Sequence, residues 1–270
     1  TMSSVRHALR QATRRPGLSL VVIVMLAVGI GATTAVYSVF HEIVVRPLPV
    51  PEPERLVNLG APGLKPGSTN CTFAGDCSEV FSYPMFRDLE ARQTVLSGIG
   101  AHRAFDVNLA HDGNSLSGVG LLVSGGYFST LNLTPARGRL IGTQDEPRIG
   151  ESAVVVLSYD YWSSQFGADE NVVGRALTVN GQALTVIGVA PEGFAGTTVG
   201  VRPKVFVPVT LRSLMEPNVA RGSTEDRRAY WLYLFGRLAP GVSVEQATAS
   251  LNGIYAGILS NVEAALQVDI

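Results

Sequence analysis

The hydropathy pattern opens with one long apolar run near the N-terminus. No Asp, Glu, Lys or Arg occurs between Arg15 and Glu42, and the apolar stretch from Leu18 to Phe40 exceeds the roughly 20 residues that span a bilayer. A soluble helix this apolar on every face is unusual. The pattern predicts one transmembrane helix over residues 17–45, and the prolines of the junction 46–53 then stop the helix and extend the chain.

The charges beside this run predict its orientation. Four arginines precede it with no acidic residue among them, namely Arg6, Arg10, Arg14 and Arg15. Basic and acidic residues are mixed after the run, so the positive-inside rule places the N-terminus in the cytoplasm and the bulk of the chain outside. The arginine-bearing stretch 1–16 predicts a cytoplasmic interfacial helix that anchors on membrane lipid. A cleaved signal peptide is the alternative, but its apolar region runs only about 7–15 residues.

Small residues recur inside the apolar run. Ala27, Gly31 and Ala35 are spaced four residues apart, which would let a second membrane helix approach closely. Ordinary use of glycine and alanine in membrane helices explains the spacing equally well.

Beyond the junction, the pattern changes to short apolar runs between turn residues, as in a folded α+β domain. Strands are expected at 54–59, 99–109, 116–124, 153–157, 176–189 and 230–238. Asn180-Gly181 predicts a hairpin turn within the fifth of these. Helices are expected to begin after Ser82, Ser158 and Ser243, because each serine can cap a following helical pattern.

Charge and cysteine content narrow the function. Residues 47–270 hold 16 basic and 21 acidic side chains, and this mildly acidic balance argues against binding nucleic acid. Cys71 and Cys77 have five residues between them in a loop rich in small polar residues, which suits a disulfide in an oxidising compartment. Two free thiols are the alternative. A zinc site is not expected, because no histidine lies near them to complete four ligands.

Motifs for enzyme chemistry are missing from the sequence. Lys65 and Lys204 are its only lysines, and neither belongs to a phosphate-binding loop. There is no Gly-x-Ser-x-Gly elbow and no His-Glu-x-x-His pair. The sequence therefore predicts no enzyme, no catalytic residue, no cofactor and no metal site.

The remaining ionisable residues have plain structural interpretations. His102 and His111 are expected at the surface or in loops, and Asp145-Glu146 in a solvated turn. The aromatic run 230–235 is expected to be a buried strand rather than a ligand platform.

Many short motifs, in one order along the chain, together resemble the N-terminal half of FtsX/MacB-like ABC permeases of the duplicated orphan type. They include Arg46-Pro-Leu-Pro, Glu54-Arg-Leu-Val, Ser82-Tyr-Pro-Met-Phe-Arg-Asp-Leu, Val155-Val-Leu-Ser-Tyr-Asp-Tyr-Trp, Val179-Asn-Gly and Val186-Ile-Gly-Val-Ala-Pro-Glu-Gly-Phe. The resemblance runs from about residue 6 to about residue 265.

The resemblance implies a membrane-anchored α+β fold, in which one N-terminal transmembrane helix precedes a periplasmic α+β domain with a β-rich insert. A porter-like subdomain is expected over 54–138 and 225–270, and the β-rich inserted subdomain over 139–224. In such permeases further membrane helices follow, so the chain is expected to be a fragment of a longer permease.

The function expected from this resemblance is that of a non-catalytic permease subunit in the bacterial inner membrane. It would relay motion from a separate cytoplasmic ATPase to the periplasmic domain, with further permease helices or a second permease copy as partners. A single-pass, membrane-anchored binding module without a transport role is the alternative. An anchored hydrolase is disfavoured by the missing motifs.

Overall fold

The computed structural model describes residues 16–40, 48–61, 63, 67–198, 200–216, 218–219 and 223–260. The chain divides into two compact units, Thr1–Pro47 and Leu48–Ile270. Each unit is described by itself.

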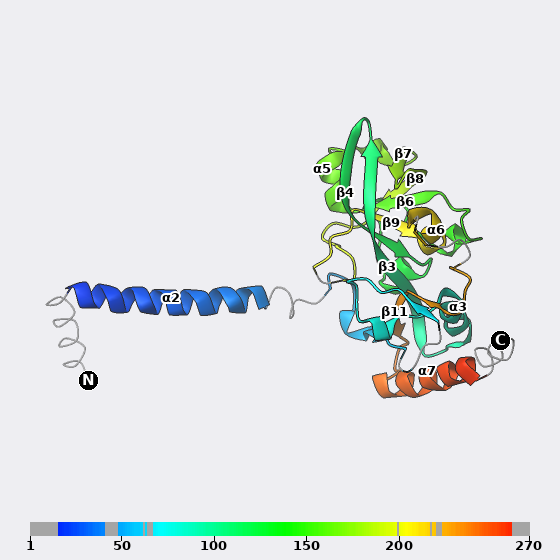
Figure 1. The fold of residues 1–270 in the computed structure, drawn as a ribbon, viewed down its shortest axis with the longest axis horizontal. Helices are drawn as coiled ribbons and strands as arrows, with labels where there is room; N and C mark the ends of the chain where they lie inside the picture. The colour runs from blue at the N-terminus through cyan, green and yellow to red at the C-terminus, as the bar shows by residue number, and fades with distance from the viewer. Residues whose placement is uncertain are drawn as a thin grey trace. The chain divides into compact units, whose positions relative to one another are not determined.

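The first unit contains the helix α2, which runs from Pro16 to Phe40 (Figure 1). Large apolar side chains such as Met25 and Ile30 are exposed along it. Within the residues whose side chains are described, no helix is long and apolar enough to cross a membrane. The span over residues 17–45 stays a prediction, and Arg6, Arg10, Arg14 and Arg15 lie outside the described residues.

The second unit is built on a nine-stranded mixed sheet in the order β1-β11-β3-β4-β9-β6-β8-β5, with β7 paired to β3 and β8. Its strands are β1 Leu56–Leu59, β3 Leu96–His111, β4 Asn114–Val123, β5 Arg137–Gly138, β6 Val154–Leu157, β7 Ala176–Val179, β8 Gln182–Val189, β9 Val205–Pro208 and β11 Tyr233–Leu238. Most neighbours are antiparallel, whereas β4–β9 and β6–β8 are parallel. A separate parallel pair joins β2 Ser68–Thr69 to β10 Ala229–Tyr230.

The strand β3 is the spine of this sheet. It pairs with β11 over Leu96–His102, with β4 over His102–His111 and with β7 at Leu109 and Ala110. In Figure 1 it runs from the end of the domain that holds α3 and α7 to the end that holds α5 and β7. One continuous strand therefore connects the two ends of the domain.

Short helices cover the sheet. They are α3 Tyr83–Arg92, α4 Tyr127–Thr130, α5 Tyr159–Gln165, α6 Arg212–Met215 and α7 Val244–Ile258. Ser82, Ser158 and Ser243 each accept a backbone hydrogen bond at a helix start, and Gln246 completes a capping box at α7. These caps confirm the predicted helix starts.

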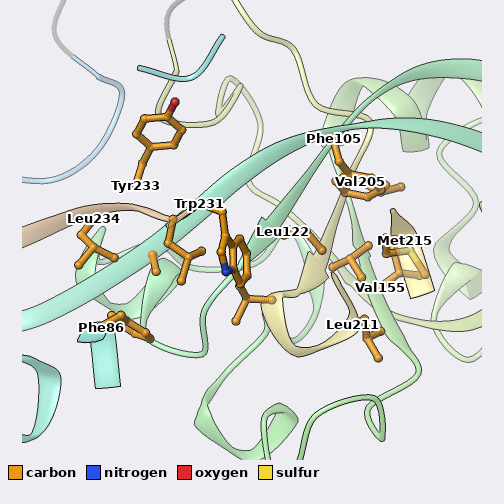
Figure 2. Close-up of a cluster of buried hydrophobic side chains, with 14 of the residues drawn as sticks. Phe86, Phe105, Leu122, Val155, Val205, Leu211, Met215, Trp231, Tyr233 and Leu234 are labelled. Carbon is orange, nitrogen blue, oxygen red and sulfur yellow. The ribbon is translucent and has the colours of Figure 1, made fainter. Parts of the chain in front are cut away.

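The interior contains two clusters of buried side chains. The larger one includes Trp231, Phe86 and Leu122, which Figure 2 shows together with their neighbours. The second is aromatic: Tyr127, Phe128 and Phe206 have ring centroids 5.1–6.3 Å apart. Burial on this scale, at roughly 25 cal/mol per Å² of apolar surface, is the main stabilising term of the domain.

The strand predictions are confirmed, with shifts at the ends. The hairpin turns at Asn180 and Gly181, where φ is 48° and 81°; both residue types tolerate this left-handed conformation. The run 230–235 is buried as expected. It is divided between β10 and β11, and between them Leu232 forms an isolated antiparallel bridge with Phe81. The predicted cysteine loop contains the short strand β2.

Two predictions about ionisable residues are wrong. His102 is buried, with 6% of its surface exposed, because it lies in the central strand β3 beneath Tyr127, Tyr233 and Phe235. Asp145 is 4% exposed rather than solvated. Its carboxylate forms a bidentate ion pair with Arg139, in which Nη1 and Nη2 lie 2.6 and 2.7 Å from Oδ2 and Oδ1, and it also accepts the backbone N–H of Gly142.

Candidate functional site

The most distinctive polar feature is a buried ionic cluster halfway along β3, which we call the Arg103 junction. It consists of Asn70, Arg103, Arg212, Glu216 and Trp231. Arg103 is 3% exposed and Arg212 is 2% exposed. Burying two guanidinium groups is costly unless they are paired and hydrogen-bonded, so the contacts that hold them matter.

Arg103 bonds three separate segments. Its Nε donates to both carboxylate oxygens of Glu216 at 3.1 and 3.0 Å, and its Nη2 donates to Oε1 at 3.0 Å. Nη1 and Nη2 donate to the backbone oxygen and to Oδ1 of Asn70, each at 2.7 Å. Nη1 also reaches the carbonyl of Trp231 at 3.4 Å. A planar guanidinium with five donors suits this role.

Arg212 completes the junction from the start of α6. Its Nε donates to Glu216 Oε2 at 2.9 Å, one helical turn away. The guanidinium lies 3.9 Å from the centre of the Trp231 ring, in cation–π geometry. Burial lowers the pKa of Arg212 to about 10, Glu216 opposes that shift, and the nearby charge of Arg103 adds to it.

The junction joins parts of the chain that are distant in sequence. Asn70 lies between β2 and Cys71, Arg103 lies on β3, Arg212 and Glu216 follow β9, and Trp231 precedes β11. The cluster holds two positive charges against one carboxylate and contains no nucleophile. It is therefore suited to fixing segments together rather than to acid–base or covalent chemistry.

Next to the junction, the structure joins Cys71 and Cys77 by a disulfide, with Cα atoms 5.1 Å apart. Tyr233 of β11 secures this loop. Its hydroxyl accepts the backbone N–H of Thr72 at 3.2 Å and lies 2.9 and 3.0 Å from the carbonyls of Thr72 and Gly75. The disulfide loop is thus tied to the central sheet from two sides, by Asn70 and by Tyr233.

A second group of carboxyls lies between α3 and the loop after β5. Burial raises the pKa of Glu146 to about 7, and Glu90 adds to the shift, while the Gly125 N–H and Arg87 oppose it. Burial also raises the pKa of Glu90, against its ion pair with Arg87. One oxygen of Glu146, Oε1, is buried and has no hydrogen-bond partner among the described residues.

The membrane-helix packing residues Ala27, Gly31 and Ala35 are exposed on α2. No heavy atom of a described residue lies within 4 Å of the position that a Cβ on Gly31 would occupy. Space for a neighbouring helix exists there, and the packing role stays a proposal. Among the described residues, no group of three or more His, Cys, Asp or Glu could hold a metal ion.

Sequence reasoning missed the Arg103 junction. The available signal was an arginine within a run of apolar and small residues, Ile99-Gly-Ala-His-Arg-Ala-Phe105, where an unpaired charge would be too costly to bury. The partner could not be identified in the same way, because Glu216 stands in a polar stretch that resembles an ordinary loop.

Comparisons with known proteins agree with this architecture. A family model described as "MacB-like periplasmic core domain" matches residues 19–254. Among curated proteins, no sequence matches the chain.

Two solved structures share the fold. The periplasmic region of MacB from Actinobacillus actinomycetemcomitans aligns with a TM-score of 0.54 at 15% identity, covering 75% of this chain and 83% of that one. The extracellular domain of the noncanonic ABC-type transporter YknZ from Gram-positive bacteria aligns with a TM-score of 0.50 at 15% identity, covering 72% of this chain and 88% of that one.

Proposed function

The chain belongs to the MacB-like periplasmic core domain family of ABC-type transporter permeases, and from this premise we propose that it is a non-catalytic permease subunit that relays motion outside the membrane. A separate cytoplasmic ATPase supplies the motion. The domain formed by residues 48–260 receives it through the N-terminal helix and passes it to extracytoplasmic partners. Substrate chemistry is not part of this role.

The observation that carries the proposal is the continuity of the sheet. The spine β3 joins the β1–β11 end to the β7–β8 end, and the Arg103 junction fixes four segments at its middle. A domain built in this way transmits displacement as one body, because packed interiors deform little. The proposed subdomains 54–138 with 225–270, and 139–224, share this one sheet.

The proposed anchor is the helix α2 with the arginines before it. Its support is the sequence: the whole of Pro16–Phe40 is uncharged, and 25 helical residues extend over about 38 Å at 1.5 Å each. The hydrocarbon core of a bilayer measures about 30 Å. Arg6, Arg10, Arg14 and Arg15 would hold the N-terminus at the cytoplasmic leaflet, and the domain would face the periplasm.

The relay is tested by spin-label distances in the full chain, reconstituted in nanodiscs with its ATP-hydrolysing subunit. One label at Ser115, on the exposed β3–β4 tip, reports the distance between two copies. A second label at Ala249 on α7 reports the distance within one copy. We expect ATP to shift the Ser115–Ser115 distance and to leave the Ser115–Ala249 distance unchanged. If ATP leaves the Ser115–Ser115 distance unchanged, the relay is contradicted and a membrane-anchored binding module is favoured.

A further inference from the structure

A cavity at the edge of the sheet has no part in the proposed relay. It has a volume of about 400 Å³ and lies between β1, α3 and α7. This volume is within the range of about 300–1,000 Å³ that is common for ligand pockets. Its floor is apolar, formed by Leu59, Phe81, Leu89, Leu251 and Tyr255. We call this cavity, together with the edge of β1 that is not paired with β11, the edge groove.

The edge groove is bordered by a strand edge rather than by one face of a strand. β1 stands at the end of the sheet order and pairs, among the described residues, with β11 alone. Four successive residues, Asn58 to Ala61, line the cavity. Asn58 and Leu59 belong to β1, and Gly60 and Ala61 follow its end. Successive side chains of a strand point to opposite faces, so a cavity that touches both Asn58 and Leu59 reaches the backbone edge at the end of β1. Unpaired N–H and C=O groups on such an edge are a template for another strand.

The rim of the edge groove carries one sign of charge. Glu79 is the charged residue among those that line it, and it is exposed. Within the part of the chain that the structure describes, Glu79 forms no ion pair. A ligand with a basic group would be complementary to this rim, whereas an acidic ligand would be repelled.

We propose that the edge groove binds an extended peptide segment of a partner protein, which adds as a strand along β1. An apolar side chain of the segment enters the cavity, and a lysine or arginine pairs with Glu79. Backbone hydrogen bonds then supply affinity and the cavity supplies selectivity, as in other cases of strand addition. This proposal does not rest on the relay function.

A peptide fits these observations better than a second copy of the chain. A two-fold contact would place the same acidic rim on both sides, so the two Glu79 side chains would not be complementary. A small apolar molecule would fill the cavity but leave the outer edge of β1 unpaired. An added strand would pair with the edge of β1, place an apolar side chain in the cavity and place a basic side chain beside Glu79.

Glycine positions allow a clean test. A Cβ on Gly60 would meet no atom of a described residue within 4 Å, and Gly60 lines the cavity, so tryptophan there should block the groove without disturbing the core. Gly253 on α7 is equally open but does not line the cavity. Gly253→Trp is therefore the matched control. Thr248→Trp blocks the groove from the opposite wall and serves if Gly60→Trp fails to fold.

The probe is a short fluorescent peptide in which lysine alternates with valine or leucine, titrated against the full chain in zwitterionic nanodiscs, with empty nanodiscs as the blank. We expect saturable binding that Gly60→Trp weakens by about tenfold or more, equivalent to about 1.4 kcal/mol, and that Gly253→Trp leaves unchanged. Glu79→Gln should weaken binding several-fold and reduce its dependence on salt.

Several results would overturn the proposal. The first is that the peptide shows no saturable binding. The second is that Gly60→Trp and Thr248→Trp both bind it as tightly as the wild type does. The third is that a peptide with glutamate in place of lysine binds as tightly as the lysine peptide. Sedimentation of the full chain provides a further check. If Gly60→Trp dissociates a dimer of the chain, the occupant of the edge groove is a second copy and not a partner peptide.

Discussion

Arg103 on β3, which is buried, and Glu216 after α6, whose side chain is 18% exposed, form an ion pair with Nη2 and Oε1 3.0 Å apart, across 113 residues of sequence. Glu216 also accepts a hydrogen bond from Arg212 at 2.9 Å, so one carboxylate balances two buried guanidinium groups. Neutralising Glu216 should therefore destabilise the junction more than any other single change in it, because it leaves two like charges facing each other.

We therefore expect Glu216→Gln to destabilise the external domain by about 3 kcal/mol, the usual cost of breaking a buried ion pair. Glu151→Gln is the control, because its pair with Arg148 is exposed and worth less than about 1 kcal/mol. Urea unfolding followed by tryptophan fluorescence measures both, and Trp231 reports directly on the junction. Equal midpoints for the two variants would show that the junction does not stabilise the fold.

Stability should also depend on pH through Glu146. Its pKa is raised from 4.5 to about 7 by burial, so the folded state holds a proton that the unfolded state has lost. The resulting stabilisation is full below about pH 4.5 and is lost as the pH rises through 7. Glu146→Gln has no carboxyl to titrate, so it should not show this loss. As the pH rises from 5 to 8, we expect its free energy of unfolding to rise by about 2 kcal/mol relative to that of the wild type.

His102 also changes the pH dependence of stability, so the effect of Glu146 is measured by comparing the wild type with Glu146→Gln. Burial lowers its pKa to about 4, so its contribution to stability is present above the ordinary value of 6.5 and is lost as the pH falls through 4. The two groups oppose each other between pH 4.5 and pH 6.5. The difference between wild type and Glu146→Gln isolates the carboxyl, and a difference that stays constant with pH would contradict the assignment.

The disulfide loop gives a third prediction. A link that closes a loop this short is expected to stabilise the domain by about 2 kcal/mol. The double variant Cys71→Ser/Cys77→Ser should lose that amount under oxidising conditions and should match reduced wild type. Thermal unfolding with and without dithiothreitol measures this. If the reductant leaves wild type unchanged, the two cysteines do not form the bond in solution.

The small-residue stripe of α2 gives a fourth prediction. Gly31→Leu should weaken helix association in a membrane dimerisation assay, because leucine keeps a second backbone at a distance. Gly29→Leu is the matched control, since Gly29 is equally open but lies off the stripe formed by Ala27, Gly31 and Ala35. If both variants associate as wild type does, the stripe is ordinary helix composition.

Local signals in the sequence predicted the elements well. Ser82, Ser158 and Ser243 marked helix starts, and Asn180-Gly181 marked the hairpin, because caps and tight turns depend on neighbouring residues only. The strand order could not be predicted in this way. β1 pairs with β11, about 180 residues later, and only tertiary packing brings these strands together.

The candidate sites divide in the same way, into those with a local sequence signal and those formed by distant segments. The spacing of Cys71 and Cys77 suggested their pairing from a local pattern. The Arg103 junction and the burial of Glu146 arise from contacts between distant segments, so the sequence showed the charged residues but not their partners. His102 was misjudged for the same reason: histidine is found both at surfaces and in interiors, and its neighbours along the chain do not show that β3 is central.

The last prediction concerns the anchor, on which the proposed function depends. Reporter cysteines at Thr13 and Glu54, in a background without Cys71 and Cys77, flank the uncharged run. In intact cells, a reagent that cannot cross the membrane should label position 54 and leave position 13 unlabelled until the membrane is opened. That result follows if Pro16–Phe40 spans the bilayer with its arginines inside. Labelling of both positions from outside, or loss of the segment before residue 46, would instead indicate an inverted or cleaved N-terminus. In that case a cytoplasmic ATPase could not act through this helix, and a secreted binding domain that uses the edge groove would be the better account.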